Sequence, residues 1–257
     1  MKCAARFIHN FIKSRFYPVK SSLFLLSILL SMRAFSQQPN IIYIMTDDMG
    51  FADLSSYGRK DYKTPNIDKL GEQGIKFLNA YSAGPLCTPT RTAFMTGRYP
   101  AKTTVGLIEP LTGNAADTSI GLASETPSVA SLLKNAGYET QLIGKWHLGT
   151  QPQHSPLRNG FDYFFGIKAG AVDYISHKHG GRIPDLYENE RLSIIPGYLT
   201  DLFAEKAVSF IRQKHNKPFF LSVMFNAPTG HGRDLPILRM MTRPISGRGD
   251  RLLPMRS

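Results

Sequence analysis

Two adjacent carboxylates, Asp47 and Asp48, directly follow a short apolar segment of the chain. Carboxylate oxygens are hard donors, and two of them held side by side are best stabilised by a divalent cation such as Ca²⁺ or Mg²⁺. The same pair also suits a solvated turn or a helix cap that binds no ion. The pair therefore indicates a metal site only if other reactive residues accompany it.

Cys87 is the second residue that could do chemistry. The sequence has two cysteines, and the other, Cys3, lies in a basic leader, so Cys87 has no partner for an internal disulfide once the leader is removed. A lone cysteine is ordinarily a small buried hydrophobic residue. Here Thr88-Pro89 predicts the start of a helix, whose free N–H groups favour an anion near residue 87. Arg91 lies about one turn further on and can reach back toward that anion.

Lys145 and His147 form a third group, because both follow a predicted strand at residues 139–143. In an open α/β sheet the ligand site lies beyond the carboxyl ends of the strands, where Asp47 and Asp48 are also expected. Taken alone, the two residues are equally typical of a surface lysine and a structural histidine.

Two motifs carry a family resemblance. The stretch C-T-P-T-R followed by M-T-G, residues 87–97, resembles the signature of the sulfatase family. The stretch G-Y-E-T-Q-L-I-G-K-W-H-L-G, residues 137–149, is similar to a second signature of that family. The resemblance spans residues 39–228 and includes N-G-F-D-Y-F-F-G at 159–166. It implies the N-terminal portion of an arylsulfatase-like enzyme of the alkaline-phosphatase-like superfamily, acting on an aryl or carbohydrate sulfate.

The resemblance also implies a mechanism. A maturation enzyme would convert Cys87 to formylglycine, whose hydrate has two hydroxyls: one attacks sulfur and the other then expels sulfate by elimination. One Ca²⁺ ion, bound by Asp47, Asp48 and residue 87, would act as a Lewis acid. Arg91 would steady the hydrate, Lys145 would bind a sulfate oxygen, and His147 would hydrogen-bond the nucleophile. Four residues lie where relatives shape the substrate pocket, and no role is assigned to them: Asp173, Tyr174, His177 and His179.

The resemblance ends after Pro228. Family members continue well beyond this length and supply further metal ligands, a second lysine, and a histidine directly after the proline, where this chain has Thr229. Residues 229–257 show neither helical nor strand periodicity and carry six Arg against two Asp, so we expect an anomalous basic tail produced by a frameshift. The missing ligands predict an underfilled calcium site and impaired activity. A phosphonate or phosphate-ester hydrolase of the same superfamily, or a non-catalytic fragment, are the alternatives.

The elements that position these residues alternate along the chain. Apolar runs at residues 40–46, 139–143 and 218–225 predict buried strands, and residues 76–81 can return as extended chain. Cap signals at Thr64, Thr126 and Thr200 predict three helices, the first two ending at Gly74 and Gly137. This alternation predicts an α/β fold with a mostly parallel sheet flanked by helices, in one truncated catalytic domain at residues 37–228.

The ends of the chain account for most of its charge. Residues 1–36 carry six Lys or Arg and no acid, followed by an apolar run at 23–30 that is too short to span a bilayer, which predicts a cleaved signal peptide and export rather than a membrane anchor. Subtracting +6 for the leader and +4 for residues 229–257 from the total of +12 leaves +2 for the domain. A nucleic-acid partner is therefore not expected, and the expected partners are a sulfated small molecule or glycan and the maturation enzyme.

Overall fold

The computed structural model describes residues 38–108, 110–111 and 119–229. The chain divides into two units, residues 1–39 and 40–257, and the described fold belongs to the second. The expected signal peptide and all but the first residue of the expected basic tail therefore lie outside the described residues. Within the described part of the chain, no helix is both long and apolar enough to cross a bilayer.

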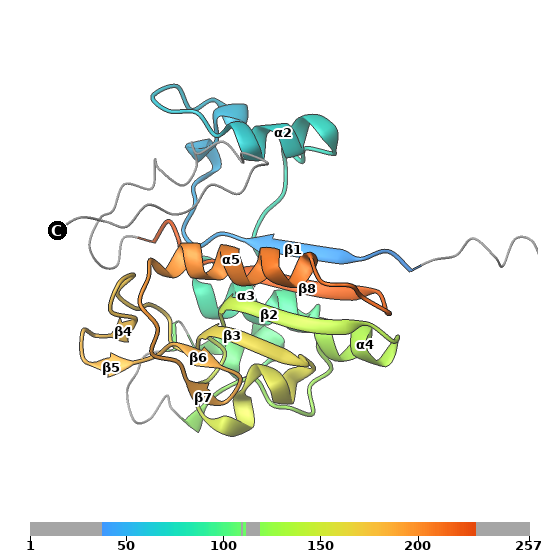
Figure 1. Cartoon of the computed structure of the whole chain (residues 1–257), viewed down its shortest axis with the longest axis vertical. Helices are drawn as coiled ribbons and strands as arrows, with labels where there is room; N and C mark the ends of the chain where they lie inside the picture. The colour runs from blue at the N-terminus through green and yellow to red at the C-terminus, as the bar shows by residue number, and fades with distance from the viewer. Residues whose placement is uncertain (1–37, 109, 112–118, 230–257) are drawn as a thin grey trace, which may run out of the picture. The chain divides into compact units, whose positions relative to one another are not determined.

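A six-stranded sheet forms the centre of the second unit, in the order β1-β8-β2-β3-β6-β7. Four neighbouring strands are parallel: β1 (Ile41–Met45), β8 (Phe219–Met224), β2 (Glu139–Lys145) and β3 (Tyr163–Ile167). The short strands β6 (Tyr187–Glu188) and β7 (Arg191–Leu192) extend the sheet in antiparallel fashion (Figure 1). The predicted α/β fold with a mostly parallel sheet is confirmed.

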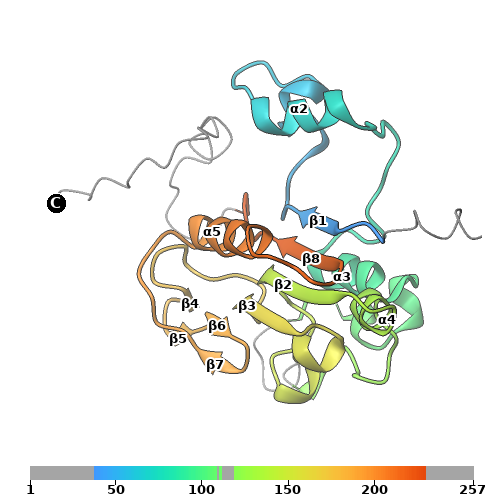
Figure 2. The same ribbon diagram turned by 45° about the vertical axis from the view of Figure 1, so that its right-hand side comes forward.

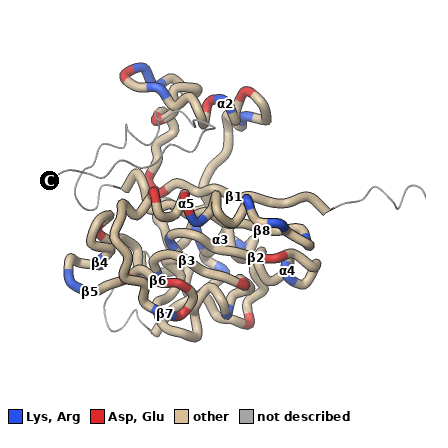
Figure 3. Tube along the Cα trace, viewed as in Figure 1, with Lys and Arg blue, Asp and Glu red and all other residues tan. Residues whose placement is uncertain are grey.

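Helices cover both faces of this sheet (Figure 2). One face packs against α5 (Leu199–Ile211) through a cluster that includes Phe203 and Phe210. The other face packs against α3 (Cys87–Thr96) and α4 (Val129–Asn135) through a second cluster. Because β8 is covered on both sides, all six of its residues are buried, as expected for a continuous apolar run in a parallel sheet. β1 and β8 carry no charged side chain, whereas the surrounding helices and loops do (Figure 3).

The helix boundaries show where local signals were misleading. Helix α2 (Pro65–Gln73) begins after Thr64 and ends before Gly74, as predicted. Helix α4, however, is capped by Ser128, whose side chain accepts a hydrogen bond from the Ser131 N–H, and the predicted cap at Thr126 is wrong. Helix α5 is preceded by Tyr198, so the predicted cap at Thr200 lies inside the helix.

Residues 76–81 were expected to return as extended chain, but they form no strand. A separate two-stranded sheet pairs β4 (Lys178–His179) with β5 (Ile183–Pro184) in the loop after β3. The remaining described elements are 3-10 helices: η1 (Phe51–Asp53), η2 (Ser55–Tyr57), η3 (Pro100–Lys102), η4 (Val105–Leu107), η6 (Pro152–His154) and η7 (Pro156–Asn159).

Two glycines allow the strands to come close together at the end of the sheet that carries the polar residues. Gly144 has a left-handed backbone (φ +118°), and a Cβ atom there would lie 1.9 Å from the carbonyl oxygen of Met224 on β8. A Cβ atom at Gly166 on β3 would lie 1.8 Å from the carbonyl oxygen of Gly144. Both positions therefore exclude any side chain.

Candidate active site

The predicted site residues meet at the carboxyl ends of β1 and β2 and at the start of α3. Asp47 and Asp48 follow β1, and Cys87 is the first residue of α3. Lys145 is the last residue of β2, which extends two residues further than predicted, and His147 follows it. Because β8 pairs with both β1 and β2, the strand ends are held at the same edge of the sheet.

Asp47 is the electrostatic centre of the site. Its Oδ2 atom accepts a hydrogen bond from Lys145 Nζ at 2.6 Å, and its Oδ1 atom accepts one from Arg91 at 3.2 Å. All three side chains are at most 5% exposed. Burial alone raises the pKa of Asp47, but the charges of Lys145 and Arg91 outweigh it, so this pKa is held below its usual value. Asp47 is therefore an anion buried between two cations.

Arg91 is fixed by contacts on both of its terminal nitrogens. Besides its ion pair with Asp47, its Nη1 donates to the carbonyl oxygen of Lys145 at 2.7 Å and lies 3.3 Å from the Met224 sulfur. Arg91 thus links α3 to the ends of β2 and β8. The sequence placed this guanidinium within reach of a negative group near residue 87, and the negative group in the structure is Asp47.

Cys87 lies at the N-terminus of α3, as predicted, although the residue that precedes the helix is Leu86 and not Thr88. The Thr88 hydroxyl donates instead to the carbonyl oxygen of His147 at 3.4 Å and accepts from Leu111 N at 3.2 Å. The Cys87 sulfur lies 3.2 Å from Lys145 Nζ, which also contacts Asp47. The half-buried thiol thus faces a cation at the positive end of a helix.

One ligand atom from each of Asp47, Asp48 and Cys87 lies within 4.8 Å of the other two. The two carboxylates suit a hard cation such as Ca²⁺, whereas a thiolate is a soft donor. An oxygen in place of the sulfur at residue 87 would give a set of oxygen donors only. Asp48 is exposed and has a left-handed backbone (φ 57°), a conformation that Asp tolerates better than most residues. The donor set therefore fits calcium once residue 87 carries an oxygen.

His147 is buried and also has a left-handed backbone (φ 54°). Its Nε2 donates to the Leu111 carbonyl oxygen at 2.9 Å, and its buried Nδ1 has no hydrogen-bond partner among the described residues. Burial, reinforced by the charge of Lys145, lowers the pKa of His147 to about 3. A Cβ atom at Gly170 would lie 2.6 Å from this ring, so the glycine lets the loop after β3 cover it. His147 is thus a neutral imidazole with a free lone pair on Nδ1.

Two residues at this site were not assigned by sequence reasoning. The Thr229 hydroxyl lies 2.8 Å from Asp47 Oδ2 and 3.0 Å from Asp48 Oδ2. The Tyr174 hydroxyl contacts the carbonyl oxygens of Asn226 and Thr229 at 2.8 and 3.0 Å. Thr229 stands where the family pattern has histidine, and that departure was the one available signal. The loop match around Tyr174 was too loose to assign it a role.

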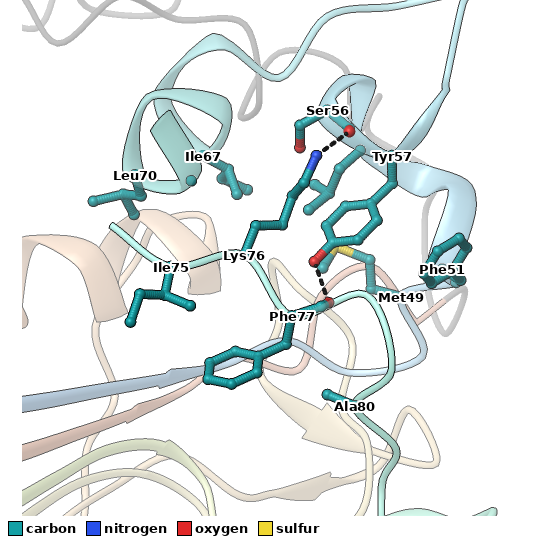
Figure 4. Close-up of a pocket in the computed structure, with 13 residues that line it drawn as sticks. Met49, Phe51, Ser56, Tyr57, Ile67, Leu70, Ile75, Lys76, Phe77 and Ala80 are labelled. Atoms are coloured by element: carbon teal, nitrogen blue, oxygen red, sulfur yellow. Dashed lines mark hydrogen bonds between the residues drawn. The ribbon is translucent and has the colours of Figure 1, made fainter. Parts of the chain in front are cut away.

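A cavity of about 500 Å³ lies in the segment that follows Asp48. The residues that line it all belong to the range 49–80 (Figure 4). Lys76 Nζ donates to the Ser56 carbonyl oxygen at 3.0 Å, and the Tyr57 hydroxyl donates to the Phe77 carbonyl oxygen at 2.9 Å. None of the residues that line this cavity belongs to the charged cluster around Asp47.

Several curated sulfatases are similar to this chain in sequence. N-acetylgalactosamine-6-sulfatase of Rattus norvegicus is 36% identical over 204 residues, which is 72% of this chain and 38% of the relative. Steryl-sulfatase of Homo sapiens is 45% identical over 146 residues, which is 51% of this chain and 24% of the relative. The chain thus spans well under half the length of these curated relatives.

Solved structures are similar as well. Ps i-CgsB in complex with k-i-k-neocarrahexaose has a TM-score of 0.68 and 36% identity, covering 75% of this chain and 46% of that chain. A structure in complex with its substrate D-glucosamine-2-N,6-O-disulfate has a TM-score of 0.61 and 31% identity, covering 75% of this chain and 35% of that chain. The sulfatase family profile matches residues 39–233, most of the sequence, and includes every residue of the cluster described above. This chain belongs to the sulfatase family.

Proposed function

We propose that this chain carries the N-terminal part, residues 37–228, of a catalytic domain that hydrolyses sulfate esters through a formylglycine formed from Cys87 and one Ca²⁺ ion. The observation that carries the proposal is the meeting of Cys87 with Asp47 and Asp48 within 4.8 Å, with Lys145 Nζ in contact with both Cys87 and Asp47. A buried cysteine with a merely structural role requires neither a paired carboxylate site nor a buried ammonium at its sulfur.

Each residue of the cluster has a proposed task. The hydrate of a formylglycine at residue 87 would supply one hydroxyl to attack sulfur and displace the alcohol, and loss of the proton from the second hydroxyl would re-form the aldehyde and release sulfate. Arg91, already fixed by Asp47 and the Lys145 carbonyl, would hold the oxygens of residue 87. Lys145 would place its charge against a sulfate oxygen, where negative charge grows in the transition state. His147, neutral and with an open Nδ1, would accept a hydrogen bond from a hydroxyl of residue 87.

Asp47, Asp48 and residue 87 would hold the calcium ion, which polarises the sulfate group when it is bound. Calcium takes six to eight oxygen ligands in proteins, and this set provides about half that number. We therefore propose that the chain by itself binds calcium weakly and turns over slowly.

A carbohydrate sulfate is the proposed substrate class, with an aryl sulfate as the alternative. N-acetylgalactosamine-6-sulfatase covers more of this chain than steryl-sulfatase does. The two structural relatives named above were solved with saccharides. These likenesses support a sulfated glycan or a sulfated small sugar.

The two ends of the chain have proposed roles that follow from composition. Residues 1–36 would direct export and then be removed, leaving a protein that is not integral to the membrane. Residues 229–257 would be a frameshifted tail, and sequencing the gene across codons 220–257 tests this: an intact frame without a sulfatase-like continuation in another frame contradicts it.

The deciding experiment is mass spectrometry of the peptide that contains residue 87, after co-expression with a formylglycine-generating enzyme. We expect the aldehyde at residue 87 and a low rate of sulfate release, absent in Cys87→Ala. Sulfate and phosphate esters of one alcohol, compared on the same preparation, separate a sulfatase from a phosphate-ester hydrolase. An unmodified thiol at residue 87 with no sulfate release supports a non-catalytic fragment and overturns the proposal.

A further inference from the structure

The Thr229 hydroxyl contacts two carboxylates but has a single proton to donate. Its oxygen lies 2.8 Å from Asp47 Oδ2 and 3.0 Å from Asp48 Oδ2, and the residue is 8% exposed. A hydroxyl has one proton, so it can donate to one of these carboxylates while its lone pairs face the other. Asp47 Oδ2 already accepts from Lys145 Nζ at 2.6 Å. The proton of Thr229 is therefore best placed toward Asp48, which leaves its lone pairs facing Asp47.

In this arrangement the Thr229 proton lies between Thr229 and Asp48, and the Lys145 ammonium faces Asp47 Oδ2, but no proton lies between the Thr229 oxygen and Asp47 Oδ2. Oxygen lone pairs at such distances repel one another unless a proton or a cation lies between them. Two ligands each about 2.4 Å from a calcium ion are separated by about 3 Å when they are neighbours in the coordination shell. The two Thr229 distances match that spacing.

We propose that Thr229, although it is the first residue of the proposed frameshifted tail, provides a neutral oxygen ligand to the divalent cation that Asp47 and Asp48 would hold. This inference rests on the calcium site of the proposed function and extends it by one residue. Hydroxyl and carbonyl oxygens commonly complete calcium shells that carboxylates begin, because they add donors without adding negative charge.

Tyr174 holds Thr229 in place and acts as a positioning residue. Its hydroxyl lies 3.0 Å from the Thr229 carbonyl oxygen and 2.8 Å from that of Asn226, and its buried ring stacks on Tyr198 with centroids 5.4 Å apart. The Tyr174 phenol is the donor in these contacts, because a carbonyl oxygen can only accept. The turn that carries Thr229 is thus tied to the loop after β3.

The test uses the whole chain and compares Thr229→Val, which keeps the shape of the side chain but removes the hydroxyl, with Thr229→Ser, which keeps the hydroxyl. Calcium affinity is measured by isothermal titration calorimetry on protein co-expressed with a formylglycine-generating enzyme, because the donor set fits calcium once residue 87 carries an oxygen. We expect Thr229→Val to weaken calcium binding about tenfold or more, and Thr229→Ser to stay within about threefold of the wild type. Urea unfolding in the presence of a chelator checks that both variants fold.

Terbium luminescence gives a second readout that does not depend on affinity. The lifetime of bound Tb³⁺ in H₂O and D₂O reports how many waters it coordinates, and loss of a protein ligand adds one. We expect one more bound water in Thr229→Val and none in Thr229→Ser. Tyr174→Phe is expected to weaken binding less than Thr229→Val does.

The outcomes distinguish this inference from the proposed function. If the wild type binds calcium and Asp48→Asn abolishes binding, but Thr229→Val changes neither affinity nor water number, then Thr229 is no ligand and only this inference fails. If the wild type and Asp47→Asn are alike in binding no calcium and no terbium, the calcium site of the proposed function fails together with its extension to Thr229.

Discussion

Lys145 and Asp47 form an ion pair of 2.6 Å in which the lysine side chain is 1% exposed and the aspartate side chain 5%. The Lys145→Met variant would remove the ammonium and leave Asp47 with Arg91 as its remaining cation. Removing one partner of a buried ion pair typically costs about 3 kcal/mol or more, because the other charge stays buried. We expect a loss of that size in the free energy of unfolding, measured with urea.

Lys206→Met is the matched control, because the Lys206–Glu188 ion pair has similar length, 2.8 Å, but side chains that are 37% and 45% exposed. Exposed pairs contribute less than about 1 kcal/mol. Equal losses of unfolding free energy in Lys145→Met and Lys206→Met would show that burial does not determine how much the Lys145–Asp47 ion pair stabilises the fold.

His147 and Asp185 should contribute slopes of opposite sign to the dependence of the free energy of unfolding on pH. The pKa of His147 is lowered from 6.5 to about 3, so the unfolded chain binds more protons between these values and stability rises with pH. Burial raises the pKa of Asp185 from 3.8 to about 6, so the folded chain binds more protons there and stability falls as pH rises. Each slope is at most about 1.4 kcal/mol per pH unit.

Between about pH 4.5 and 6 the two contributions oppose each other. The His147→Gln variant should therefore lose stability with rising pH relative to the wild type, and Asp185→Asn should gain it. Urea unfolding at several pH values in this window measures both slopes. Parallel curves for all three proteins would contradict the shifted pKa values of both residues.

Gly144→Ala should prevent stable folding. The new Cβ atom would lie 1.9 Å from the Met224 carbonyl oxygen, in a backbone conformation that also disfavours side chains. Gly58→Ala is the control, since Gly58 has a similar φ of +110° but open space around it, and should cost about 1 kcal/mol. Circular dichroism and thermal unfolding compare the two, and a folded Gly144→Ala with a loss equal to that of Gly58→Ala would refute the steric argument.

Ser128→Ala should cost about 1 kcal/mol, because Ser128 caps α4 by accepting from Ser131 N at 3.0 Å. Its hydroxyl also donates to the Asn159 carbonyl oxygen at 2.6 Å, which adds to the loss. Thr126→Ala, at the position that the sequence favoured as the cap, should change the free energy of unfolding by less than about 0.5 kcal/mol. The reverse ranking in thermal unfolding would place the cap where the sequence suggested it.

The strands were the most predictable part of the fold. β1 and β8 are short apolar runs bounded by polar residues, and both form parallel strands where they were expected. The expected burial is confirmed for β8. It is wrong for β1, which is the terminal strand of the described sheet and leaves Ile42 46% and Ile44 55% exposed. Helix starts were less predictable. At residues 126–127 the Thr-Pro pair indicates a helix start, but Thr126 and Ser128 can both act as the N-cap residue. Ser128 is the cap of α4, and its hydroxyl also donates to the carbonyl oxygen of Asn159. The local sequence does not reveal that second contact.

The charged residues of the polar cluster and Cys87 were predictable from the sequence, but their pairing and the presence of Thr229 were not. The family motifs pointed to Cys87, Arg91 and Lys145, whereas the convergence of Arg91 and Lys145 on Asp47 depends on the order of β1, β8 and β2 in the sheet. Thr229 lies 182 residues from Asp47 in the sequence, and no local pattern connects them. Long-range contacts of this kind need the sheet order first.

The pairing of β1 with β8 also determines when the central sheet can form during translation. β1 is the first described strand to leave the ribosome, and among the described residues it pairs with β8 alone. Its pairing therefore has to follow the translation of the last described strand. At ordinary elongation speeds the interval between the synthesis of Cys87 and that of β8 is on the order of ten seconds. The enzyme of the proposed maturation would have this interval to act on Cys87 before the completed sheet brings Asp47 and Lys145 against the sulfur.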